Sequence, residues 1–235
     1  MAGATLSKVS TRFTLQDGVY EQLQQALMWG QFEPSQAITI SSLASEFGTS
    51  HMPVREALRR LAAEKALEIG SNGSARVPAV SRENLDDICL ARLSLEGTAT
   101  EEAAKQATVE QINTAEALSK EHARLGDAGD VLGMLRKNQE FHFAVYEMSG
   151  SKVLHQLILM LWLRFGPYMR LLSDHVEREI QNGKTDDFER IHRQIITALR
   201  EGDAKRARAM MREDIQTTRD LIRTLLTPAG SVMRG

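Results

Sequence analysis

Three polar side chains recur at four-residue intervals near the start of one predicted helix: His51, Arg55 and Arg59. Residues spaced by four project from the same face of an α-helix. Arginine can donate two hydrogen bonds to the edge of a guanine, and the amino-terminal end of a recognition helix meets base edges in the major groove. This face could therefore read DNA, although an arginine-rich helix face can equally be a solvated surface.

The elements around this face favour the DNA-reading interpretation. Ser50 is expected to cap the helix, and an amphipathic helix over 15–29 and a short helix over 41–47 precede it. After it, the segments ALEI and ARVPAV flank a GSNGS turn and predict a β-hairpin. Three helices followed by a hairpin predict a winged helix-turn-helix domain over residues 10–80.

The rest of the chain, residues 81–228, has helical periodicity throughout. Short loops separate six predicted helices, over residues 82–106, 108–125, 130–148, 151–176, 187–201 and 203–226. Long helices joined by short loops are typical of an antiparallel bundle. The chain is therefore expected to be mainly α, with an all-helical carboxy-terminal domain of about six helices.

Composition limits the function only broadly. The net charge is −2, so a DNA-binding face would have to arise from local segregation of charge rather than from a basic domain. The single cysteine, Cys89, excludes an intrachain disulfide and is expected to be buried. The sequence has no apolar stretch of transmembrane length. These features predict a cytoplasmic protein with no membrane partner.

The stretch ITISSLASEFGTSHMPVREALRRLAAEKALEI, above all PVREAL followed by RL, resembles the amino-terminal domain of GntR-family transcription regulators. The resemblance implies that the chain binds double-stranded DNA, with Arg55 as the central contact. The residues that we assign to DNA binding lie on the second helix, the reading helix and the wing: Ser41, Ser50, His51, Met52, Arg55, Arg59, Asn72, Gly73 and Arg76.

The chain departs from the family pattern at several positions in this domain. Ser35 and Lys65 stand where the family usually has glycine. His51 and Met52 stand where arginine and threonine are frequent, and Ser41 replaces a common basic residue. We therefore expect the family fold, combined with an operator preference particular to this chain.

Three later motifs resemble the FCD ligand-sensing domain of the FadR subgroup: ARLSLEGTATEEAA, NQEFHFAVYEMSGSKVL and RIHRQIITALREGDAKRARAMMREDI. Six helices fit the VanR-like branch of that subgroup. The resemblance implies a ligand-responsive transcription regulator, more often a repressor than an activator. It also implies a homodimer on a palindromic operator, because twofold protein symmetry reads twofold DNA symmetry.

Many FCD domains bind a divalent metal through an aspartate, a histidine four residues later and two histidines from later helices. The corresponding positions here carry Asn138, His142, His192 and Asp214. The resemblance thus implies a site for Zn²⁺ or a similar ion, with oxygen in place of one nitrogen ligand. In the alternative, the pocket holds no metal and His142 and His192 bind a carboxylate effector directly.

Arg92 stands where the family often has an inward-pointing arginine, which would bind the carboxylate of an effector. In the alternative, Arg92 lies at the surface or forms an ion pair with Glu96, four residues later. The remaining bundle histidines match no ligand pattern and are expected at the surface or an interface: His122, His155 and His175. Three aromatic residues are expected in the core or a dimer contact: Trp162, Phe165 and Tyr168.

Two other functions compete with the ligand-responsive regulator. The bundle could serve only to dimerise a DNA-binding protein. Glu189-x-x-His192 is half of the pattern of di-iron bundle enzymes, but Gln139 stands where a second such motif would need glutamate before His142. We therefore expect a regulator rather than an enzyme.

Overall fold

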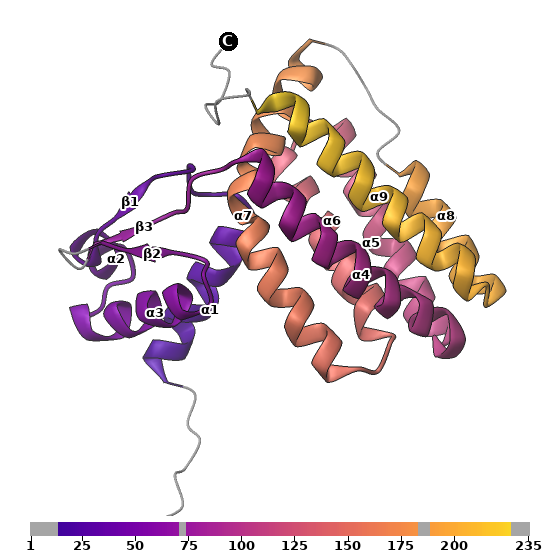
Figure 1. The fold of residues 1–235 in the computed structure, drawn as a ribbon, viewed down its shortest axis with the longest axis horizontal. Helices are drawn as coiled ribbons and strands as arrows, with labels where there is room; N and C mark the ends of the chain where they lie inside the picture. Colours follow the sequence, from indigo (N-terminus) through magenta and orange to yellow (C-terminus); the bar gives the residue numbers. More distant parts are fainter. Residues whose placement is uncertain (1–13, 71–73, 183–188, 227–235) are drawn as a thin grey trace, which may run out of the picture.

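The computed structural model describes residues 14–70, 74–182 and 189–226. Within this part, a small amino-terminal head lies to one side of a larger helical bundle (Figure 1). The head contains α1 (Leu15–Met28), β1 (Ala37–Ile38), α2 (Ile40–Glu46), α3 (His51–Ala63), β2 (Glu68–Ile69) and β3 (Ala75–Arg76). The bundle contains α4 (Arg82–Gln106), α5 (Val109–Asp127), α6 (Val131–Glu147), α7 (Lys152–Gln181), α8 (Arg190–Glu201) and α9 (Ala204–Leu225).

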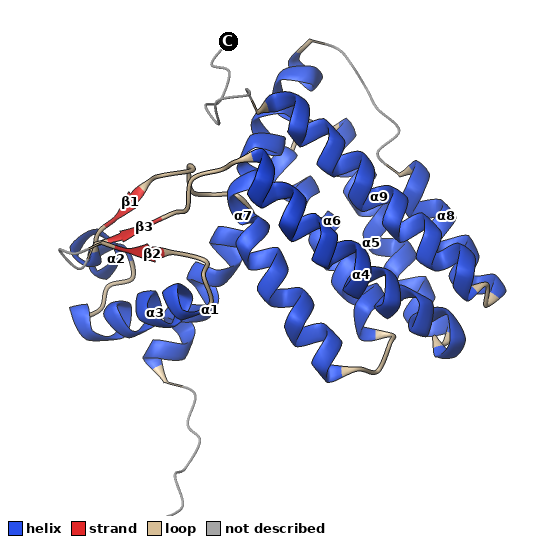
Figure 2. Ribbon diagram, in the orientation of Figure 1, coloured by secondary structure: helices blue, strands red, loops and turns tan. Residues whose placement is uncertain are grey.

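The predicted hairpin is present as β2 and β3, and all strands among the described residues lie in the head (Figure 2). A third strand, β1, pairs antiparallel with β3, so that β3 lies in the middle of the sheet. β1 was not predicted from the sequence, because two residues are too few to show an alternating pattern. Asn72 and Gly73, at the tip of the predicted wing, lie outside the described residues.

The head is held together by an apolar face of α3 that packs on α1. Val54, Leu58 and Leu61 are buried, as their helical spacing predicts. At the rim, the Tyr20 hydroxyl donates to the Glu64 carboxylate, with O–O distances of 2.7 and 2.9 Å. Arg60 covers the Tyr20 ring, its guanidinium carbon 3.6 Å from the ring centroid. These contacts fix the orientation of α3.

The bundle confirms the six predicted helices, with α7 extending to Gln181 rather than ending at 176. Trp162, Phe165 and Tyr168 are buried, as expected of core residues, and so is Cys89. No helix among the described residues combines the length and apolarity needed to span a bilayer.

The head docks on the bundle through the end of α1. A Cβ added at Gly166 in α7 would overlap the Leu27 carbonyl oxygen, so the two backbones are in direct contact there. Beside this contact, Trp29 Nε1 donates to Gln139 Oε1 of α6 at 2.5 Å. Arg136, one turn earlier on α6, lies over the Trp29 ring at 4.5 Å. The head therefore touches both α6 and α7.

Lys65 is expected to be replaceable by glycine with a gain in stability. It follows α3 with φ of +62°, and Gly48 follows α2 with φ of +61°. The left-handed conformation costs a residue with a Cβ about 1–2 kcal/mol, while glycine loses part of that advantage through its freer unfolded chain. We expect Lys65→Gly to raise the free energy of unfolding by up to about 1 kcal/mol, measured by urea denaturation.

Gly48→Ala provides the matched control, since a Cβ at Gly48 meets no atom within 4 Å. It should lower the free energy of unfolding by about 1 kcal/mol through backbone strain alone. A loss of stability in Lys65→Gly would show that the lysine side chain contributes more than its strain costs.

Candidate functional site

The start of α3 presents an open polar face. His51, Met52, Arg55 and Arg59 are exposed. Within the described part of the chain, Arg55 makes no hydrogen bond or ion pair, whereas Arg59 Nη1 lies 3.3 Å from Glu56 Oε1. An exposed guanidinium at the amino-terminal end of a helix is placed to contact a base edge or a phosphate.

The other residues predicted to bind DNA differ in their exposure and in their hydrogen bonds within the protein. Ser50 occupies the N-cap of α3 as predicted, but its side chain makes no capping hydrogen bond. Ser41 is exposed on α2. Arg76 is exposed on β3, and its Nη1 donates to the Ser35 carbonyl oxygen at 2.8 Å. The start of α3 is thus more open to a partner than the described base of the wing.

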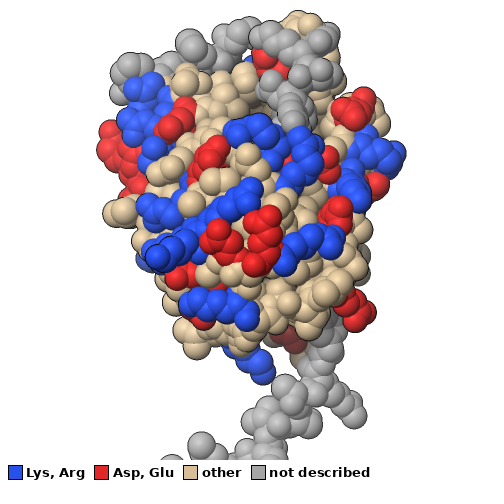
Figure 3. All heavy atoms as spheres, turned by 90° about the vertical axis from the view of Figure 1, so that its right-hand side faces the viewer, with Lys and Arg blue, Asp and Glu red and all other residues tan. Residues whose placement is uncertain are grey.

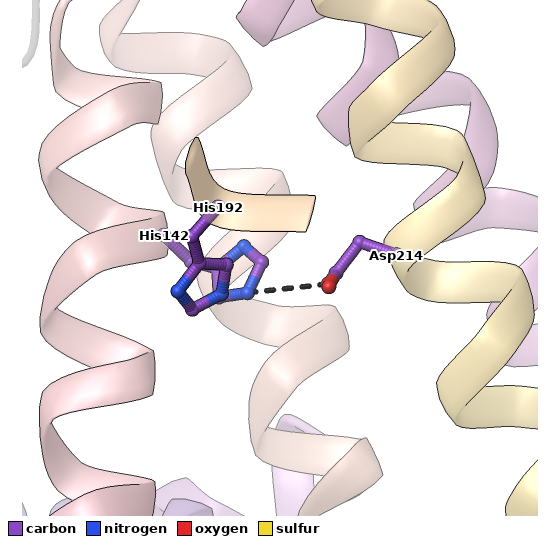
Figure 4. Close-up of side chains that lie close together, drawn as sticks. All are labelled: His142, His192 and Asp214. Atoms are coloured by element: carbon purple, nitrogen blue, oxygen red, sulfur yellow. Dashed lines mark ion pairs between the residues drawn. The ribbon is translucent and has the colours of Figure 1, made fainter. Parts of the chain in front are cut away.

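A cavity of about 410 Å³ lies inside the bundle, between α4, α5, α6, α7, α8 and α9. It brings together all four residues of the predicted metal set, with Asn138 and His142 from α6, His192 from α8 and Asp214 from α9. Ligand atoms of His142, His192 and Asp214 all lie within 4.8 Å of one another. The two imidazoles and the carboxylate converge from three helices (Figure 4).

A chain of buried polar contacts leads from Arg92 to this cluster. Arg92 donates from Nε and Nη2 to the two carboxylate oxygens of Glu96, at 2.6 and 3.1 Å. The Tyr146 hydroxyl donates to Glu96 Oε2 at 2.5 Å, and His142 Nδ1 lies 3.1 Å from the Tyr146 oxygen. The Arg92–Glu96 pair is the alternative to effector binding that the i, i+4 spacing of these residues offers, whereas Tyr146, which comes from another helix, was not predicted.

These contacts determine which nitrogen of His142 carries the proton. Because Tyr146 gives its only hydrogen to the Glu96 carboxylate, its oxygen accepts a hydrogen bond from Nδ1–H of His142. The lone pair of His142 then lies on Nε2, 3.4 Å from Asp214 Oδ2, the contact dashed in Figure 4. A hydrogen bond behind a ligating histidine is the usual way to orient the ring toward a metal.

Burial sets the protonation of the cluster. It holds the pKa of His142 well below its ordinary value, helped by the nearby His192. It lowers the pKa of His192 to about 3, again with a smaller contribution from a neighbouring histidine. It raises the pKa of Asp214 to about 7. Both imidazoles are therefore neutral at pH 7 and have lone pairs to offer.

The donor set fits a divalent cation. The Nδ1 atom of His192 is buried and has no hydrogen-bond partner among the described residues, which is costly unless a ligand satisfies it. Two neutral imidazoles with carboxylate and amide oxygens nearby are ligands that suit Zn²⁺ and similar ions.

The expectation that His122 lies at the surface is wrong. Its side chain is buried on α5 and lines the cavity, with its ring centroid 5.1 Å from that of His192. The spacing of Ile112, Ala115, Ser119 and His122, all buried, follows one helix face. That periodicity indicates burial of His122 independently of any ligand pattern. His175 also lines the cavity and is half-buried.

One face of the bundle carries charges of both signs. Viewed from the right-hand side of Figure 1, basic and acidic side chains alternate over this face (Figure 3). Bundle residues form ion pairs of this kind, such as Arg208 with Glu101 at 2.7 Å and Arg206 with Glu201 at 2.8 Å. A surface of mixed sign is poorly suited to a DNA backbone.

Two family models match the chain. The model for bacterial regulatory proteins of the gntR family matches residues 15–77, and the FCD domain model matches residues 87–217. The domain division that we propose between residues 80 and 81 falls between these ranges.

Individual relatives agree with the family models. The chain is 30% identical to the HTH-type transcriptional regulator McbR of Escherichia coli (strain K12), over 67% of this chain and 72% of that protein. It is 27% identical to the gluconate operon transcriptional repressor of Bacillus licheniformis, over 77% of this chain and 74% of that protein.

Solved structures share the fold. The structure of E. coli McbR/YncC superposes with a TM-score of 0.83 at 26% identity, covering 91% of this chain and 99% of that one. A putative GntR regulator from Rhodococcus sp. RHA1 has a TM-score of 0.73 at 17% identity, covering 90% of this chain and 99% of that one. The chain therefore belongs to the GntR family of bacterial regulatory proteins, in the group that combines a GntR head with an FCD domain.

Proposed function

We propose that this DNA-binding transcription regulator is a repressor whose operator affinity is set by a small carboxylate effector bound in the bundle. One observation carries the proposal: a cavity of about 410 Å³ with converging polar groups lies in the same chain as an exposed polar face on α3. A bundle that served only for dimerisation would have no use for two buried histidines and a half-buried aspartate converging on a cavity. The gluconate operon relative, itself named a repressor, supports the sign of regulation.

The enzyme alternative finds less support. Glu189 does not join His192 in the cluster, because it accepts from Ser119 at 3.3 Å and pairs with Arg193 at 3.0 Å. A di-iron site needs several glutamates around two metals, and the one cluster found among the described residues has two histidines and one aspartate.

Selection of binding sites from random-sequence duplexes tests the DNA-binding part of the proposal. We expect purified protein to enrich an inverted repeat whose half-sites are centred about one or two helical turns apart. Enrichment of single, unrepeated sites would contradict the palindromic operator and the dimer that reads it.

The homodimer would form through exposed apolar residues on α7 and α4. Val153, Leu157 and Met160 are large, exposed and spaced along one face of α7. Leu90 is exposed on α4, which packs against α7. Exposed apolar residues repeated along one helix face commonly mark a protein interface, and a second copy of the chain would cover these residues and present two heads.

The double variant Val153→Asp with Leu157→Asp is expected to be monomeric, because each charge would be buried in the interface. Loss of the second, linked half-site should weaken operator binding by at least about 100-fold. Light scattering after gel filtration measures the oligomer, and fluorescence anisotropy measures operator affinity. Val109→Asp, at an equally exposed valine on α5, is the control and should remain dimeric.

A divalent cation would be held by His142, His192 and Asp214, with the Asn138 amide beside them. When bound, it would offer an open coordination position to an effector carboxylate. Tyr146 and Glu96 would keep the His142 ring in the ligating tautomer.

Zinc affinity is expected to fall on acidification because Asp214 must lose its proton to ligate. With its pKa near 7, protons compete below pH 7 and not above it, so affinity at pH 6 should be about tenfold lower than at pH 8. The histidines add little to this slope above pH 5, since burial keeps their pKa values low. Competition with a chromophoric chelator measures the affinity.

Asp214→Asn is the control for this pH dependence and should bind zinc weakly but with little change between pH 8 and pH 6. An equal slope in that variant would assign the titration to another group.

A further inference from the structure

One wall of the cavity is an apolar stripe of α7, while polar residues such as Arg190, Thr217 and Thr218 line other parts of it. Trp162, Phe165, Met169, Leu172 and Val176 all line it, at spacings of three and four residues that keep them on one helix face. At about 1.5 Å per residue this stripe is about 21 Å long. On this side the cavity is thus bordered by apolar side chains over several helical turns.

The polar cluster lies near one end of this stripe. The His142 ring centroid is 5.3 Å from that of Trp162, the first residue of the stripe. Because a short connection joins α6 to α7, the two helices run antiparallel, and residues earlier on α6 lie further along α7. Those cavity-lining residues are Met134 and Leu135, so the apolar wall continues on a second helix away from the cluster.

Arg92, which lies at the same end of the stripe as the polar cluster, adds no net positive charge to the cavity, because it is paired with Glu96. The Arg92 guanidinium lies 4.7 Å from the Trp162 ring and 4.4 Å from the Phe165 ring, and Glu96 neutralises it. Two of its nitrogens already donate to that carboxylate. The part of a ligand that lies beside Trp162 and Phe165 therefore contacts aromatic rings rather than a series of hydrogen-bonding groups.

We propose that the effector is an amphipathic monocarboxylate, with its head at the His142–His192–Asp214 end and a hydrocarbon body along the α7 stripe. This inference rests on the proposed effector function. A volume of about 410 Å³ corresponds to about fourteen waters at about 30 Å³ each, which suits a body of several carbons. A polyhydroxylated acid would leave its hydroxyls unpaired against the stripe.

Isothermal titration of the 235-residue chain with hexanoate, octanoate, decanoate and gluconate tests this proposal. Titrations are made with and without one equivalent of zinc chloride. Each buried methylene should raise affinity by about fourfold. The increment should be the same with and without zinc, because the alkyl chain lies away from the carboxylate and its ligands. Gluconate should bind more weakly than hexanoate.

Leu172→Gln, in the stripe, should lower decanoate affinity by about tenfold or more and flatten the rise with chain length. Leu132→Gln is the matched control, since Leu132 is exposed on α6 and does not line the cavity. It should leave the series unchanged. Circular dichroism establishes that both variants are folded.

The possible failures are distinguishable. Gluconate binding more tightly than decanoate, or affinity independent of chain length, would overturn the hydrocarbon body and leave a carboxylate effector in place. Binding of none of the four acids would overturn both this inference and the effector role of the cavity. Neither result would affect the operator found by site selection, which tests the DNA-binding function separately.

Discussion

Replacing Arg55 by alanine is expected to weaken operator binding by about 10- to 100-fold. Arg55 is exposed near the start of α3 and makes no hydrogen bond or ion pair with the other described residues, so its guanidinium is available to a guanine edge. One bidentate arginine–guanine contact is worth about 1–3 kcal/mol. Fluorescence anisotropy with the selected operator, at fixed salt, measures the loss.

Arg59→Ala serves as the comparison on the same helix. Arg59 is already paired with Glu56, so its removal should cost less than the removal of Arg55. Both variants should retain the wild-type unfolding transition and zinc affinity, because neither side chain reaches the bundle. Unchanged operator affinity in Arg55→Ala would remove Arg55 from the reading face. An equal loss on random DNA would make it a phosphate contact instead.

Replacing Gly166 by alanine is expected to disrupt the docking of the head. The added Cβ would overlap the Leu27 carbonyl oxygen, a backbone atom that cannot rotate away. The end of α1 must then separate from α7, which should lower the free energy of unfolding by about 1–3 kcal/mol. It should also break the hydrogen bond from Trp29 to Gln139. If the substitution is made in a Trp162→Phe background, Trp29 is the remaining tryptophan, and its fluorescence reports this change.

Gly97→Ala is the matched control, since it also adds a methyl group to a buried helical glycine. There the nearest atom would be Arg212 Cγ at 3.3 Å, part of a flexible side chain, so the cost should be smaller. Wild-type stability and fluorescence in Gly166→Ala would mean that α1 and α7 can separate slightly without loss of the interface.

The helices were predictable because each depends on local spacing and capping. The limits of α4 and the burial of Val54, Leu58 and Leu61 follow from such signals. The convergence of His142, His192 and Asp214 was suggested by family resemblance, because no local pattern connects residues on three helices. The hydrogen bond from Tyr146 to Glu96 could not be predicted from a local sequence pattern, since fifty residues separate the two.

The wing illustrates the same limit. The β2–β3 hairpin follows from a turn between two short segments, whereas β1 joins the sheet across about forty residues. Its pairing depends on tertiary contact and not on its own two residues. His122 was misplaced for a different reason, because its residue type was weighed for metal ligation and its position on the apolar face of α5 was not.

Helix α6 faces two partners at once. Asn138 and His142 line the cavity, while Arg136 and Gln139 hold Trp29 of the head. If an effector shifts this helix, linkage requires reciprocity: the operator must change effector affinity by the same factor by which the effector changes operator affinity. Titrations with and without operator would measure that factor. Promoter occupancy would then influence how much effector the protein retains, so the regulator's sensitivity would depend on whether it is already on DNA.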